Sequence, residues 1–148
     1  MAAAHHNAGL VHRQLRNWNA ARTHLLRALK IDRTVDHRRG IVSDLRQLAF
    51  LSWENGDPRG GLGLFAEALE VDKLAGDATG APLDTWSIAS VHVELQEWDT
   101  ALQLVRDAER LFGEVGASSQ QALARQLVRQ VTRVLHERAT HDEGQEGE

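Results

Sequence analysis

The chain repeats itself at an interval of 40 residues, and this repeat restricts the possible folds more than any other sequence feature. A self-similar interval of about 20–50 residues is the signature of an array of similar structural units. Small residues at fixed steps let neighbouring helices approach closely, because a larger side chain would overpack the contact. The repeated positions are Gly9, Ala49 and Ala89; Ala21, Gly61 and Ala101; Ala28, Ala68 and Ala108; the large apolar Leu25, Phe65 and Val105; and Trp18 with Trp98, which are two intervals apart.

Each unit of the repeat is predicted to form two helices. Apolar residues recur at helical spacing on both sides of a short breaker, and no stretch alternates as a β-strand would. Asn17 and Asp57 are able to cap the helices that follow them, and Pro58 suits a first helical position. We therefore predict an all-α fold. The expected parts are three helix pairs over residues 2–40, 41–80 and 81–117, a capping helix over 118–139, and a disordered acidic tail over 140–148.

These residues resemble tetratricopeptide repeats. The segment from His5 to Arg13 resembles the first helix of that family, and Asn17-Trp18-Asn19-Ala20-Ala21 resembles the turn that opens its second helix. The common unit of the family has about 34 residues. The 40-residue interval, with turns at Asp36…Gly40 and Gly76…Gly80, is similar to the long variant of kinesin light chains and of bacterial signalling and transcription regulators. The resemblance implies a right-handed α-solenoid.

The resemblance also implies that the first helix of each pair lines a concave groove for a peptide or a partner helix. Trp and Arg are enriched at binding hot spots, so we expect apolar partner groups on the aromatic rings and an acidic group on Arg46. Alternatively, Phe50 and Trp53 pack between repeats, and Trp86 packs against a neighbouring helix. The expected groove residues are His6, Asn7, Leu10, Arg13, Arg46, Gln47, Phe50, Trp53, Trp86 and Ser90; the expected structural positions are Gly9, Trp18, Ala21, Ala28, Ala49, Phe65, Ala68, Ala89, Trp98, Ala101 and Ala108.

Enzymatic and metal-binding motifs are missing from the sequence. The chain has no Cys, so thiol catalysis and Cys-based zinc sites are excluded. His136 and His141 are one residue too far apart for a His-Glu-x-x-His motif, and Gly60-Gly61-Leu62-Gly63 lacks the Lys and Ser/Thr of a phosphate loop. Asp84 and Glu94 are expected on an exposed helix surface. We predict a protein without catalytic activity, cofactor or metal.

Charge and composition narrow the expected partner to a protein or peptide. The net charge of −4 argues against direct nucleic-acid binding, and no apolar run approaches the roughly 18 residues of a membrane span. Among the basic residues, 15 of 17 are Arg, which suggests a GC-rich bacterium. The start from Met1 to His6 lacks the pattern of a signal peptide, and we expect a cytoplasmic protein. Two functions remain open. The chain is either a protein-interaction module, or a structural segment of a larger transcription or signalling regulator that self-associates into a homo-oligomer.

Overall fold

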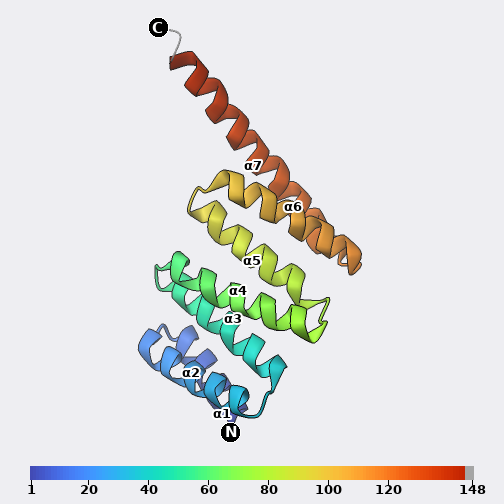
Figure 1. Cartoon of the computed structure of the whole chain (residues 1–148). Helices are drawn as coiled ribbons and strands as arrows, with labels where there is room; N and C mark the ends of the chain where they lie inside the picture. The colour runs from blue at the N-terminus through green and yellow to red at the C-terminus, as the bar shows by residue number, and fades with distance from the viewer. Residues whose placement is uncertain (146–148) are drawn as a thin grey trace. The chain divides into compact units, whose positions relative to one another are not determined.

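The computed structural model describes residues 1–145, with side chains to residue 141, and in that range the chain forms seven α-helices and no strand (Figure 1). The predicted all-α fold, with three helix pairs and a final helix, is confirmed. The helices are α1 (Ala2–Gln14), α2 (Trp18–Thr34), α3 (Arg38–Glu54), α4 (Pro58–Ala75), α5 (Gly80–Glu94), α6 (Trp98–Glu114) and α7 (Ser118–Gln145).

The helices belong to two compact units, which are described separately. The first unit spans Met1–Asp84 and holds α1 to α4 with the beginning of α5. Within it, α1 packs against α2, α2 against α3, and α3 against α4 (Figure 1). The second unit begins at Thr85, and in it α6 packs against α7.

Consecutive helices are joined by turns that recur every 20 residues, half of the sequence interval. In each turn one residue has a positive φ, between 51° and 87°, and the amide of the next residue donates to a carbonyl five residues earlier. An example is Asn17 N to His12 O, at 2.8 Å. This is the Schellman motif, which satisfies the last carbonyls of a helix. The residues with positive φ are Arg16, Asp36, Gly56, Gly76, Gln96 and Gly116.

Of the two helix N-caps predicted from the sequence, the structure shows one and not the other. Asp57 caps α4 as predicted, because its carboxylate accepts a hydrogen bond from Gly60 N at 2.9 Å, and Pro58 is the first residue of that helix. The predicted cap at Asn17 is wrong, since its side chain makes no capping bond to α2.

The repeated small residues all lie at helix contacts. A Cβ on Gly9 would come within 2.6 Å of Leu25 Cγ, and one on Gly61 would come within 2.8 Å of the Ala49 carbonyl oxygen. Trp18 and Trp98 are half-buried. The close packing of each pair therefore depends on these small residues. The fully buried positions are Ala21, Ala28, Ala49, Phe65 and Ala68 in the first unit, and Ala89, Ala101 and Ala108 in the second.

The last helix is longer than the sequence predicts. We expected the capping helix to end at residue 139, but α7 continues to Gln145. Good helix formers such as Glu137, Arg138 and Ala139 extend it, and no Pro or Gly interrupts the chain before Gly144. The rest of the predicted acidic tail, residues 146–148, lies outside the described residues.

Candidate protein-binding groove

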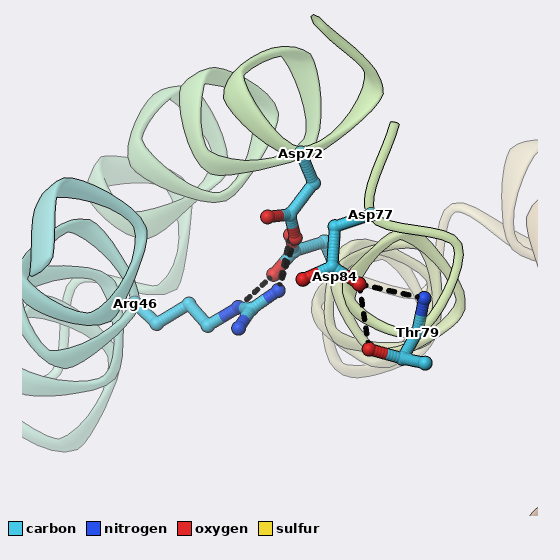
Figure 2. A network of polar contacts seen from close by, with 5 residues as sticks. All are labelled: Arg46, Asp72, Asp77, Thr79 and Asp84. Carbon is cyan, nitrogen blue, oxygen red and sulfur yellow. Dashed lines mark hydrogen bonds and ion pairs between the residues drawn. The ribbon is translucent and has the colours of Figure 1, made fainter. Parts of the chain in front are cut away.

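Arg46 of α3 is held between two buried carboxylates of the first unit, Asp72 on α4 and Asp84 on α5 (Figure 2). Its Nη2 donates to Asp72 Oδ2 at 2.6 Å and to Asp84 Oδ2 at 2.9 Å, and its Nε donates to Asp84 Oδ1 at 2.6 Å. The expectation that Asp84 lies on an exposed surface is wrong, because only 1% of its side chain is exposed. The guanidinium expected to receive a partner's acidic group is already paired inside the protein.

Burial and charge act against each other in this network. Burial acts to lower the pKa of Arg46, but the hydrogen bonds and charges of Asp84 and Asp72 raise it above its usual value. Burial raises the pKa of Asp72, although the charge of Arg46 acts in the opposite direction. Beside them, Asp77 accepts hydrogen bonds from the Thr79 hydroxyl at 2.6 Å and the Thr79 amide at 2.9 Å, which lower the pKa of Asp77 (Figure 2).

The same three positions recur 40 residues earlier with a different first residue. His6, Asp32 and Asp44 correspond to Arg46, Asp72 and Asp84. His6 Nδ1 lies 2.6 Å from Asp44 Oδ1, and Asp32 Oδ1 lies 3.0 Å from the Nδ1 of His37. Burial raises the pKa of Asp44, although the hydrogen bond and charge of His6 act to lower it.

A glycine makes room for the α2 or α4 carboxylate in both layers. A Cβ on Gly40 would collide with the carboxylate of Asp32, and a Cβ on Gly80 would collide with that of Asp72. This explains why Gly40 and Gly80 stand 40 residues apart in the sequence. Each glycine lets the start of one helix approach the acidic side chain of the helix before it.

In the second unit the corresponding positions carry apolar residues. Trp86, Phe112 and Ala124 stand 40 residues after Arg46, Asp72 and Asp84. The rings of Trp86 and Phe112 meet edge to face, with centroids 6.4 Å apart, and Trp86 packs against the core that contains Phe112 and Ala124. Ser90, also predicted to line the groove, donates its hydroxyl to the carbonyl oxygen of Trp86 at 2.8 Å. Trp86 therefore fits the alternative in which it packs against a neighbouring helix.

A cavity of about 580 Å³ opens between α1 and α3 in the first unit. At its wall, the Nε and Nη2 of Arg13 donate to the two carboxylate oxygens of Glu54, each at 2.7 Å, and Nη1 donates to Gln47 Oε1. The hydrogen bond from Arg13 lowers the pKa of Glu54. We call this space the Arg13 cavity. It is lined by Leu10, Arg13, Gln14, Arg16, Trp18, Gln47 and Glu54.

Phe50 and Trp53, two of the aromatic residues predicted for the groove, are half-buried on α3. The Arg13 guanidinium carbon lies 5.6 Å from the centroid of the Phe50 ring. Phe50 also meets the buried Phe65 edge to face at 5.0 Å and lies 6.4 Å from Trp53. Phe50 thus contributes to the packing between α3 and α4 within one helix pair, whereas the alternative interpretation expected packing between repeats.

A second cavity, of about 410 Å³, lies at the beginning of α1. It contains the two other groove positions predicted on this helix, His6 and Asn7, together with Asp32 and Gly40. The sequence interpretation missed Asp32 and Asp44 as site residues. The signal was present, since Asp44 and Asp84 stand 40 residues apart, as do His6 and Arg46.

Two classes of feature are absent from the part of the chain that the structure describes. No three side chains of His, Cys, Asp or Glu are arranged there to hold a metal ion. No helix in that part combines the length and apolar character needed to cross a bilayer.

Comparison with known proteins agrees with the helix pairs. A sequence model of the tetratricopeptide repeat matches residues 2–35, which contain α1 and α2. Over these residues the chain is similar to the tetratricopeptide-repeat family. Repeats of this family generally mediate protein–protein interaction and are typically not enzymes.

The fold of the chain also occurs among solved structures. The crystal structure of the apo form of RapI matches with a TM-score of 0.82 and 19% sequence identity. The match covers 92% of this chain but 50% of RapI, so the chain spans half the length of that protein. No curated protein sequence matches the chain.

Proposed function

We propose that the chain binds a protein or peptide partner in the groove between α1 and α3, with the Arg13 cavity as its centre. The observation that carries this proposal is the cavity itself, because three residues expected in the groove from the sequence, Leu10, Arg13 and Gln47, line it. A concave site with apolar walls and a few fixed polar groups is the usual form of a binding pocket.

The side chains of the cavity are suited to a short peptide. Arg13 is held by Glu54 and Gln47, so its guanidinium loses little side-chain entropy when a partner binds. The amides of Gln14 and Gln47 offer both donors and acceptors for a peptide backbone. Leu10 and the half-buried Trp18 supply apolar surface for one partner side chain.

A bacterial, cytoplasmic regulatory role belongs to the same proposal. It is supported by the resemblance of the 40-residue unit to the long variant of the repeat and by the excess of Arg over Lys. No catalytic step forms part of the proposed function.

A peptide-display selection on the intact chain tests the binding proposal. Peptides that bind the native chain should bind a Gln47→Ala variant at least about tenfold more weakly, because the variant loses an amide of the cavity wall. A Gln103→Ala variant is the matched control, since Gln103 is exposed on α6 in the second unit. Equal affinities for the native chain and the Gln47→Ala variant would refute this site.

A further inference from the structure

The two polar layers of the first unit differ in one respect. In the later layer the Nη2 of Arg46 bridges the two carboxylates, since it donates to Oδ2 of both Asp72 and Asp84. In the earlier layer the corresponding carboxylates, Asp32 and Asp44, are both present. His6 stands in the place of Arg46 and contacts only Oδ1 of Asp44, just as the Nε of Arg46 contacts Oδ1 of Asp84.

The bridging donor is therefore missing from the earlier layer. Oδ2 of Asp44 is buried and has no hydrogen-bond donor among the described residues, and none of the Asp44 side chain is exposed. The corresponding oxygen of Asp84 accepts from Arg46. The two acids of the earlier layer interact, because the charge of Asp32 acts on the carboxyl group of Asp44. A buried acceptor without a donor is costly, which favours a ligand that supplies one.

The earlier layer also opens to the surface. The cavity of about 410 Å³ at the beginning of α1 is lined by both His6 and Asp32, and Gly40 leaves its floor without a side chain. Asn7 and Ser43 add an amide and a hydroxyl to its wall. Asn7 and Gln14 lie two turns apart on α1, and Ser43 and Gln47 lie one turn apart on α3, so this cavity and the Arg13 cavity follow the same two helix faces.

We propose that this cavity binds the guanidinium group of an arginine side chain of the partner, which bridges Asp32 and Asp44 as Arg46 bridges Asp72 and Asp84. The inference rests on the proposed binding function and specifies the chemistry of one partner side chain. A planar guanidinium matches paired carboxylates through several fixed donors, whereas an ammonium acts as a point charge.

The other charged groups around the cavity allow a cation to enter. His6 contacts Asp44 and His37 contacts Asp32, each through its Nδ1. Arg39 also lines the cavity, but its side chain is exposed and its charge also acts on Asp77. Asp32 therefore supplies the acidic group that lines the cavity, while the side chain of Asp44 beside His6 is fully buried.

Titration of the ¹⁵N-labelled intact chain with acetyl-arginine amide tests the proposal. The amide signals of Gly40 and Ser43 should shift with this probe and should respond at least about tenfold more weakly to acetyl-citrulline amide, which has nearly the same shape but no charge. Acetyl-lysine amide should be weaker than the arginine probe. An equal response to the citrulline probe, or no response to arginine, would overturn the proposal, and this comparison requires no variant.

A His6→Arg variant tests the same site within the chain, because it places an arginine in the earlier layer at the position that corresponds to Arg46. The new guanidinium should fill the site, abolish the response to acetyl-arginine amide and raise the melting temperature. A folded His6→Arg variant that still responds as the native chain does would contradict the proposal.

Peptides selected at the Arg13 cavity that carry no arginine should bind the His6→Arg variant with the same affinity as the native chain. If those peptides bind while the arginine probe fails on the native chain, the arginine site is wrong and the binding function stands.

Discussion

At the scale of single residues, corresponding side chains of the repeat have different roles because their neighbours differ. Asp84 is fully paired with Arg46, whereas Asp44 has only His6 and one acceptor oxygen without a donor. Removing one partner of a buried ion pair leaves an uncompensated charge, while removing a poorly compensated charge relieves its cost. The same substitution at the two positions should therefore have opposite effects.

An Asp84→Asn variant should lose about 3 kcal/mol of unfolding free energy at pH 7, because Arg46 loses its main charged partner. An Asp44→Asn variant should be as stable as the native chain or more stable at pH 7. The raised pKa of Asp44 means that its protonated form favours the folded state, and this stability is lost as the pH rises through the raised value. The advantage of Asp44→Asn should thus shrink toward pH 4. Urea unfolding of both variants measures the difference, and an equal loss in both would contradict this account.

Three histidines at the contact of α1 and α2 predict a sensitivity to acid. His24 lies 3.1 Å from His5 between their Nδ1 atoms, and its ring stacks on His12 with centroids 5.4 Å apart. Burial, and then the charges of His12, His5 and Arg27, lower the pKa of His24 below 6.5. A lowered pKa means that the neutral form favours the folded state. This contribution is present above about pH 6.5 and is lost as the pH falls through the lowered value.

Replacing His24 by Leu should make the melting temperature less dependent on pH between 7.5 and about 5, because Leu64 and Leu104 occupy the corresponding positions of the other units. His136→Leu, at an exposed position of α7, is the control. The expectation fails if His24→Leu and the native chain lose stability in parallel on acidification.

At the scale of helices, the sequence predicted most of the fold because apolar spacing and turn residues agree in all three units. The predicted turn Gly76…Gly80 begins at Gly76, which has a positive φ of 68° in the structure, and Gly56 and Gly116 also have positive φ at helix ends. The matching turns at Arg16, Asp36 and Gln96 carry no glycine, so their conformation is imposed by the packing of the flanking helices. The buried acids were also missed. Burial of a charge depends on a partner from another helix, as with Arg46 and Asp84, and a pattern within one helix does not contain it.

Two glycines of α4 show how tertiary contacts decide the effect of a side chain. A Gly63→Ala variant should gain about 0.5–1 kcal/mol, because a Cβ there meets nothing within 4 Å and alanine favours the helix. A Gly61→Ala variant should be destabilised, because its Cβ would approach the Ala49 carbonyl oxygen at 2.8 Å. Thermal unfolding compares the two variants. If Gly61→Ala is as stable as Gly63→Ala, α3 and α4 do not pack as described.

At the scale of the whole molecule, the features that suit a binding role gather in the first unit. The Arg13 cavity and the carboxylate layers lie there, while the corresponding layer of the second unit is apolar and closed by Trp86 and Phe112. The family resemblance pointed to the concave helix faces. The choice among the predicted groove residues required the structure, because the internal partners of Arg46, Phe50 and Trp86 lie on other helices.

Hydrogen–deuterium exchange of the intact chain, with and without a selected peptide, tests the central claim of a binding groove in the first unit most directly. Exposed backbone at a groove becomes protected when a partner covers it, while elements remote from the groove keep their exchange rates. The account predicts that protection upon peptide binding is concentrated in the C-terminal half of α1 and in α3, with α7 unchanged. Protection confined to α6 and α7, or protection that depends only on protein concentration and not on peptide, would contradict it and favour self-association.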